Sequence, residues 1–224
     1  MIERADLARM IDHSVLRPES TEDEVKKACE LAVELGLAAV VVNPYHIPIT
    51  VAGLKGSKVK ACSVIGFPFG LSATEAKLAE AKAVLAKGAE EIDVVMNFSA
   101  LRSGREDDVL NELTRMIALA KESGKGIVVK AILETCYLNY TQKKQACLVA
   151  VKAGADFVKT STGFGAAGAT VDDVRLLRRT VPSSVGVKAA GGIRTADQAV
   201  QMVEAGANRI GTSSSLSILN AMQQ

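Results

Sequence analysis

Three lysines and one aspartate interrupt segments that are otherwise as apolar as buried β-strands. They are Lys130, Lys159, Lys188 and Asp93. A lysine attacks a carbonyl only as the free amine, which at an unperturbed pKa of ~10.4 is well under about 1% of the population at pH 7. A second ammonium group and a partly dry pocket both lower that pKa. The set therefore predicts a lysine that forms a Schiff base with a small carbonyl substrate, helped by another lysine, and the residue types do not say which one attacks.

Alternation along the segments brings these side chains into one enclosed space. In 91–97, Ile92, Val94 and Met96 form an apolar face, so Asp93 falls on the opposite, inward face. The same alternation predicts the inward residues of all four segments, which are Glu91, Asp93, Asn97, Val128, Lys130, Ile132, Glu134, Phe157, Lys159, Ser161, Gly186, Lys188 and Ala190.

A structural ion network is the other interpretation of the same residues. In it, Asp93 and Glu134 would neutralise Lys130 and Lys188, because isolated buried charges are costly. Three lysines on neighbouring strands favour a functional cluster, and a site that only binds a metabolite would not need two lysines so close. Small neighbours such as Gly186 are expected to leave space beside the amine of Lys188.

A repeated helix-glycine-strand junction indicates how these segments are arranged. Helical runs end at Gly36, Gly88, Gly154 and Gly206, and a short apolar strand follows each time. Glycine just past a helix end takes the left-handed conformation at little cost. Capping-box patterns, in which a side-chain oxygen accepts from free N–H groups of the first turn, mark helix starts. They are expected at 21–24, 72–75 and 195–198, with looser versions at 139–142 and 170–173.

These signals give eight strand candidates, each followed by a helical segment, with a short extra helix before the first. Eight alternating α/β units favour a (β/α)₈ TIM barrel, with a doubly wound open sheet as the alternative. No linker divides the chain, so a single domain over 1–224 is expected. The strand candidates are 10–16, 38–43, 59–65, 91–97, 127–133, 156–161, 184–190 and 208–212.

Glycines and serines after the last three strands predict a phosphate site. Gly191 and Gly192 follow the strand of Lys188, Gly163 follows that of Lys159, and 211–215 reads Gly-Thr-Ser-Ser-Ser. Free backbone N–H groups and helix N-termini bind anions, and barrels often place a phosphate at the loops after strands 7 and 8. A P-loop pattern is missing from the sequence, so a nucleoside triphosphate is not indicated.

The bulk composition narrows the class of protein. The 224 residues carry 27 basic and 25 acidic side chains, interspersed, so neither a nucleic-acid tract nor a membrane-binding face is expected. The four cysteines lack C-x-x-C spacing and there are two histidines, which argues against a zinc site. No signal peptide or membrane span is recognisable, and the cytoplasm is the expected compartment.

Motifs along nearly the whole chain resemble those of the deoxyribose-phosphate aldolases, which are class I aldolases on a (β/α)₈ barrel. The two lysine motifs are the most specific when taken together. The matching stretches are 11–18, 42–44, 64–68, 91–95, 134–135, 157–163 and 187–194.

The resemblance implies a lyase that reversibly cleaves 2-deoxy-D-ribose 5-phosphate to acetaldehyde and D-glyceraldehyde 3-phosphate. It implies that Lys159 is the Schiff-base nucleophile, Lys188 its proton-transfer partner, and Asp93 a proton donor and acceptor that works through a water. Because the iminium group is the electron sink, neither a metal nor an organic cofactor is expected. The implied phosphate-binding positions are Gly163, Gly191, Gly192, Ser213 and Ser214, and the implied supporting residues are Asp12, Lys130 and Thr160.

Other features are of lower weight. Relatives form homo-oligomers, so a dimer or tetramer is expected, and a non-covalent phosphosugar isomerase or synthase on the same barrel is the alternative function. Arg17 stands where the family usually has a lysine, so the geometry of the phosphate site and the range of accepted substrates are carried over from the family less directly. His13 is expected to be structural and Cys136 a packing residue.

Overall fold

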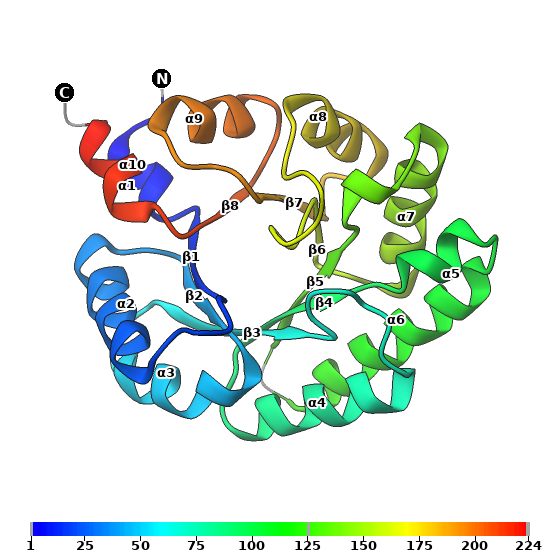
Figure 1. Cartoon of the computed structure of the whole chain (residues 1–224), viewed down its shortest axis with the longest axis horizontal. Helices are drawn as coiled ribbons and strands as arrows, with labels where there is room; N and C mark the ends of the chain where they lie inside the picture. Colours follow the sequence, from blue (N-terminus) through cyan, green and yellow to red (C-terminus); the bar gives the residue numbers. More distant parts are fainter. Residues whose placement is uncertain (1, 125, 223–224) are drawn as a thin grey trace.

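A closed barrel of eight parallel strands forms the centre of the molecule. The computed structural model describes residues 2–124 and 126–222, and each strand pairs with the next along the chain until β8 pairs with β1 (Figure 1). Closure excludes the open-sheet alternative. All eight predicted strands are confirmed, with each end within two residues of its expected place. They are β1 (Ile11–Val15), β2 (Ala39–Val42), β3 (Lys60–Ile65), β4 (Glu91–Val95), β5 (Val128–Ile132), β6 (Phe157–Lys159), β7 (Gly186–Ala190) and β8 (Arg209–Thr212).

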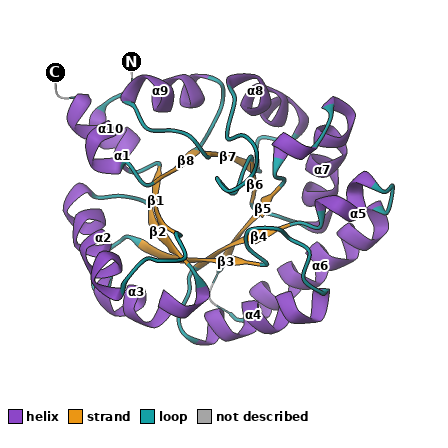
Figure 2. Ribbon diagram, viewed as in Figure 1, coloured by secondary structure: helices purple, strands orange, loops and turns teal. Residues whose placement is uncertain are grey.

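Helices surround the strands on every side (Figure 2). The extra N-terminal helix is present as α1, and it packs against α10, where Arg4 Nε donates to the carbonyl of Leu219 at 3.1 Å. Two short 3₁₀ turns, η1 (Pro44–His46) and η2 (Thr135–Tyr137), follow β2 and β5. The helices are α1 (Arg4–Ala8), α2 (Glu22–Leu35), α3 (Ile47–Gly53), α4 (Thr74–Ala86), α5 (Phe98–Arg102), α6 (Glu106–Glu122), α7 (Tyr140–Ala153), α8 (Val171–Thr180), α9 (Ala196–Glu204) and α10 (Ser215–Ala221).

Side-chain caps start four of the helices where the sequence predicts them. Full capping boxes are formed at Thr21, Asn139 and Thr195, with the third helical residue bonding back to the cap in each case. Thr170 accepts from the third backbone N–H of α8, which is the looser form expected there. These caps fix the points at which α2, α7, α8 and α9 leave the strands before them.

The capping box predicted to begin at Ser72 is wrong. Helix α4 begins at Thr74, after Ala73, and no side chain caps it. Contacts with α6 hold this helix start instead: the hydroxyl of Thr74 and the amine of Lys77 both donate to Glu112, at 3.2 and 2.7 Å. Tertiary bonds from a buried carboxylate thus replace the local cap.

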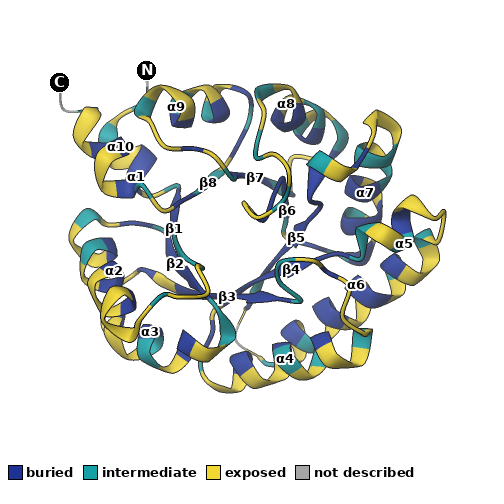
Figure 3. Cartoon of the chain, viewed as in Figure 1, coloured by how far each residue is buried: buried dark blue, intermediate teal, exposed yellow. Residues whose placement is uncertain are grey.

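Two apolar regions fill the fold. The larger lies between the strands and the helices, and the exposed residues lie mostly on the outer faces of the helices (Figure 3). A small cluster inside the barrel joins Ala39 and Val41 of β2 to Cys62 and Val64 of β3. The side of the interior toward β4–β8 is left to charged groups. Among the described residues, no helix combines the length and the apolar character needed to cross a bilayer.

Candidate functional site

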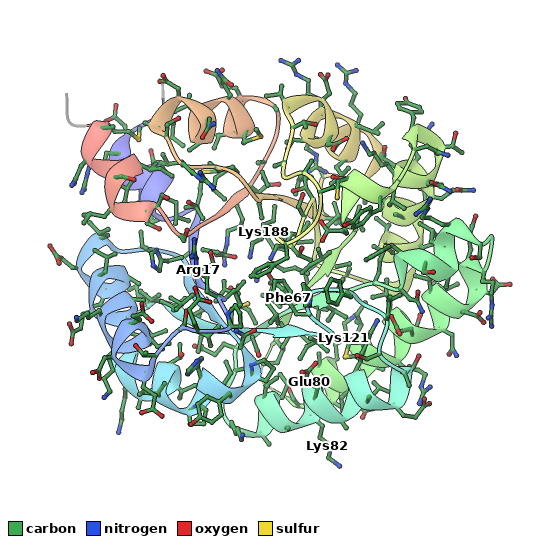
Figure 4. All side chains as sticks on the ribbon, in the orientation of Figure 1. Arg17, Phe67, Glu80, Lys82, Lys121 and Lys188 are labelled. Carbon is green, nitrogen blue, oxygen red and sulfur yellow. The ribbon has the colours of Figure 1, made fainter. Side chains whose placement is uncertain are left out.

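Lysines 159 and 188 lie directly opposite each other on neighbouring strands. The register pairs Lys159 of β6 with Lys188 of β7, and Asp93 of β4 with Lys130 of β5. All four side chains point inward and are at most 3% exposed, as alternation predicts. Lys188 lies within the ring of strands, whereas Lys82 projects from the outer surface of the molecule (Figure 4).

Asp93 joins the three lysines. Its Oδ2 accepts hydrogen bonds from Lys159 at 2.8 Å and from Lys188 at 2.7 Å, while its Oδ1 accepts from Lys130 at 2.8 Å. The thiol of Cys62 donates to the same Oδ1 at 3.3 Å. Burial opposes ionisation of the carboxyl, but the three ammonium groups outweigh it and hold the pKa of Asp93 well below its usual range.

The two opposed lysines differ in electrostatic surroundings. Burial lowers the pKa of Lys159, Lys188 lowers it further, and Asp93 only partly opposes them. For Lys188, burial is outweighed by two carboxylates, Asp12 at 2.5 Å and Asp93 at 2.7 Å, so its pKa is raised. Lys159 is therefore the amine that loses its proton more readily, and the geometry separates the two lysines where the residue types do not.

A second layer of charge lies toward the N-terminal ends of the strands. Lys130 contacts Glu91 at 2.5 Å and Asp12 at 3.7 Å, and Arg209 contacts both carboxylates at 2.8 Å. Burial opposes ionisation of Asp12, but Lys188, Lys130 and Arg209 outweigh it and lower its pKa to about 2. Sequence reasoning missed Arg209, the first residue of β8, and also missed the thiol of Cys62.

Glu134 does not neutralise a lysine, as the alternative ion-network interpretation would have it, and its side chain does not follow the alternation predicted for 127–134. Strand β5 ends at Ile132, and Glu134 adopts a left-handed backbone (φ 44°, ψ 64°) that takes its side chain out of the alternation. Its carboxylate accepts from the backbone N–H of Thr162 at 3.2 Å and from the Thr162 hydroxyl. Burial raises the pKa of Glu134. Glu134 thus holds the loop after β6 instead of joining the lysine network.

Gly186 does not leave room for Lys188 as expected. A Cβ there would lie 2.2 Å from the ring of Phe157, so the aromatic ring occupies that space. Room for Lys188 comes from the other side, where a Cβ on Gly211 would lie 3.2 Å from its Cε.

A cavity of about 720 Å³ opens above the lysines, at the C-terminal ends of the strands. Four of the five predicted phosphate-binding residues line it, together with the guanidinium-bearing residues Arg17 and Arg194. Ser214 is not among the lining residues, and its N–H already donates to the Thr212 hydroxyl at 2.9 Å. The lining phosphate candidates are Gly163, Gly191, Gly192 and Ser213.

Close packing of two glycines joins the loops after β6 and β7. A Cβ on Gly168 would lie 2.1 Å from the carbonyl oxygen of Gly191, and a Cβ on Gly191 would lie 3.0 Å from Cα of Gly168. Ala169 N–H also donates to the carbonyls of Ala190 and Gly191, at 3.1 and 3.0 Å. Gly163 and Gly191 both line the cavity and carry no side chain that would keep a ligand from their backbone.

Three further residues take local roles. The hydroxyl of Thr160 both donates to and accepts from the backbone of Ala190, at 3.1 Å each, and so links β6 to β7. His13 bonds Ser215 Oγ through Nδ1 at 2.7 Å, and burial lowers its pKa. Cys136 is half-buried beside Glu134. Within the described residues, no three His, Cys, Asp or Glu side chains are grouped so as to hold a metal ion.

Comparison with known proteins gives a consistent result. The family model for DeoC/LacD family aldolases matches residues 7–221. The chain is 50% identical over 214 residues to the deoxyribose-phosphate aldolase of Caldanaerobacter subterraneus subsp. tengcongensis, covering 96% of this chain and 92% of that protein. It is 51% identical over 216 residues to the deoxyribose-phosphate aldolase of Thermococcus gammatolerans, covering 96% and 95%.

A solved structure extends the match to three dimensions. The tetrameric deoxyribose phosphate aldolase of Aeropyrum pernix superposes with a TM-score of 0.92 at 38% identity, over 99% of this chain and 93% of that one. The match of sequence, barrel and family model over nearly the full length shows that this chain belongs to the DeoC/LacD family of aldolases.

Proposed function

We propose that the chain is a class I aldolase that reversibly cleaves 2-deoxy-D-ribose 5-phosphate to acetaldehyde and D-glyceraldehyde 3-phosphate, through a Schiff base on Lys159. The observation that carries the proposal is the shared contact of Lys159 and Lys188 with one oxygen of Asp93, with the pKa lowered on Lys159 and raised on Lys188. The names of the relatives support the choice of substrate.

The proposed reaction begins with attack of the free amine of Lys159 on C1 of the open-chain sugar. Loss of water gives an iminium ion, and removal of the proton from the C3 hydroxyl lets the C2–C3 bond break. Its electron pair moves toward the iminium nitrogen, which leaves an enamine on Lys159 and releases glyceraldehyde 3-phosphate. Protonation at C2 and hydrolysis then release acetaldehyde and restore the amine.

Asp93 and Lys188 have separate roles in these proton transfers. Asp93 stays ionised and lies 2.8 Å from the Lys159 nitrogen, so it can accept and return protons through a water at the site. Lys188 stays protonated and disfavours a second positive charge on Lys159. Asp12 and Lys130 support the pair by fixing Lys188 and Asp93, and Thr160 fixes β6 against β7.

The phosphate of the substrate is proposed to bind the backbone groups of Gly163, Gly191 and Gly192, with Ser213 beside them. Ser214 is kept in the proposed set through its side chain, since its N–H already bonds Thr212. Support comes from the cavity, which extends from the two lysines to the loops after β6, β7 and β8. The test is Ser213→Asp, which should raise KM for 2-deoxyribose 5-phosphate and leave the reaction of unphosphorylated 2-deoxyribose nearly unchanged. Equal loss with both sugars would contradict this assignment.

Trapping of the intermediate tests the covalent step. The protein is incubated with acetaldehyde, reduced with borohydride, and its peptides are weighed. An ethyl group on the Lys159 peptide is expected, and it should be lost in Lys159→Leu but kept in the surface control Lys82→Leu. Failure to find an adduct under any condition would reject the aldolase in favour of a non-covalent isomerase, synthase or binding barrel.

We further propose that the chain works in the cytoplasm as a homo-oligomer. The four cysteines are free thiols, three of them buried, which suits a reducing compartment. The Aeropyrum pernix aldolase is a tetramer. Light scattering on the purified protein should give a mass of two or four chains of 23.5 kDa, and a monomer at all concentrations would contradict the oligomer.

A further inference from the structure

The interior of the barrel holds one continuous network of buried charge. Three carboxylates and four basic groups are linked by contacts of 2.5 to 3.7 Å. The basic groups thus exceed the carboxylates by one when every group is ionised. The members are Asp12, Glu91, Asp93, Lys130, Lys159, Lys188 and Arg209.

Neutrality of this network requires one basic group to be uncharged. Uncompensated charge is costly in a buried, low-dielectric interior, so the state with three positive and three negative charges is favoured. Arg209 does not release its proton, because a guanidinium remains charged in proteins and this one contacts two carboxylates. Lys130 contacts three carboxylates and Lys188 contacts two.

Lys159 is left as the group that loses its proton. It contacts a single carboxylate, and it shares that Oδ2 atom with Lys188. Of the other ionisable groups that face it, Cys62 remains a neutral thiol, since burial raises its pKa. Glu134 has both carboxylate oxygens bonded to Thr162, and burial raises its pKa although the nearby charge of Lys159 opposes this. Within the described residues, Glu134 forms no ion pair with a lysine or arginine, so it stands outside the network.

Arg209 supplies the positive charge that makes this balance possible. It lies at the start of β8, away from the cavity, and bonds Asp12 and Glu91, each at 2.8 Å. Without it, three carboxylates would face three lysines, and the network would be neutral only with Lys159 protonated. We propose that Arg209 is a positioning residue that keeps Lys159 uncharged, an inference that rests on the proposed role of Lys159 as nucleophile.

The test follows the protonation of Lys159 through the pH dependence of its labelling, in the unsubstituted chain and in variants of the full chain. Lys159 is reductively methylated with formaldehyde and cyanoborohydride from about pH 6 to about pH 10, and the extent of labelling is read from its peptide. Arg209→Met should shift the labelling curve of Lys159 upward by about one pH unit, which is roughly a tenfold slower reaction at pH 7. Arg209→Lys, which keeps the charge, should stay near the unsubstituted protein.

A double variant tests whether the effect of Arg209 on Lys159 comes from its charge. Arg209→Met combined with Glu91→Gln removes one positive and one negative charge, so the labelling curve should return toward its original position. The control is Arg178→Met, because Arg178 bonds the backbone carbonyls of Val185 and Val181 and the side chain of Asn208, next to Arg209, but forms no ion pair with a member of the network. Arg178→Met should lower stability without moving the curve.

Each possible result either supports or overturns the proposed role of Arg209. An upward shift in Arg209→Met that is reversed by Glu91→Gln supports the proposal, and a rate reduced by the same factor at every pH overturns it. If Arg209→Met does not fold, Glu91→Gln alone must shift the curve downward, and an unchanged curve overturns the proposal. Absence of an acetaldehyde adduct in the unsubstituted protein would reject the aldolase function, while formaldehyde labelling would still report on Arg209.

Discussion

Lys159 and Lys188 are opposite residues of neighbouring parallel strands, and both of their nitrogens reach the same oxygen of Asp93. One shared acceptor keeps the two amines close enough for each to disfavour the charge of the other. Asp12 makes the surroundings of the two lysines differ, because it gives Lys188 a second carboxylate at 2.5 Å and leaves Lys159 with one. A residue on β1 therefore accounts for the opposite pKa shifts of the two lysines.

Replacing Lys188 with Met should suppress the reaction near neutral pH. Lys159 would then keep its proton, and a proton-transfer group would be lost, so turnover should fall by roughly 10²- to 10⁴-fold. Part of the loss should be recovered as the pH is raised. The measurement is the pH dependence of adduct formation with acetaldehyde, and the control is Lys143→Met, whose ammonium pairs with Asp173 outside the barrel. An adduct that forms at the normal rate at pH 7 would contradict the assignment.

Replacing Glu134 with Ala should weaken substrate binding more than it slows chemistry. The carboxylate holds Thr162, one residue before the phosphate candidate Gly163, through both its N–H and its hydroxyl. We expect KM for the phosphorylated sugar to rise by roughly tenfold, with a smaller change in kcat, because part of the anion site is then no longer held in place. Glu134→Gln keeps the shape of the side chain and should retain more of the binding. A fall in kcat at unchanged KM would argue for a direct chemical role.

Acid should destabilise the protein between about pH 4 and about pH 2. The folded-state pKa of Asp12 is about 2 and that of Asp93 is also lowered, both below the unfolded value of ~3.9. Their contribution is therefore present above the unfolded pKa and is lost as the pH falls through the folded pKa, with roughly 2 kcal/mol from Asp12. Thermal unfolding at a series of pH values measures this. Asp12→Asn should flatten the curve, and the exposed control Asp172→Asn should leave it unchanged.

The buried ion pair between α4 and α6 should matter far more than an exposed one. Lys77 and Glu112 are 0% and 4% exposed and 2.7 Å apart, and Lys77 also donates to the carbonyl of Val95 at the end of β4. Glu112→Ala should cost about 3–5 kcal/mol of unfolding free energy, because it leaves a buried ammonium unpaired. The exposed pair Lys60–Glu90 has the same 2.7 Å distance, and Glu90→Ala should cost under about 1 kcal/mol. Urea titrations of both variants give the comparison, and similar losses would refute it.

The strands and the inward lysines could be predicted because alternation and glycine junctions are local signals. Lys159 and Asp93 interrupt apolar runs, so their burial was readable from their neighbours alone. The ion-pair partner of each charged residue could not be predicted from the sequence, since the contact between Lys188 and Asp12 depends on β8 closing against β1. Arg209 was missed because a charged residue at the start of a strand is usually a solvated one.

The direction of the Glu134 side chain could not be predicted from alternation along its strand. Period-two reasoning holds only while the backbone is extended, and β5 ends at Ile132. The left-handed turn at Glu134 then directs its side chain to Thr162, a contact set by the neighbouring loop. The capping box expected at Ser72 fails for a related reason, since Glu112, 38 residues beyond Thr74 in the chain, holds the start of α4.

Because Gly168 packs directly against Gly191, the loops after β6 and β7 are fixed to each other. Neither glycine can gain a side chain unless the other loop retreats, because the space is already filled by backbone. Directed evolution of substrate range should therefore leave these two positions alone and vary the rim near Arg17, where the cavity wall is made of side chains that can be exchanged one at a time.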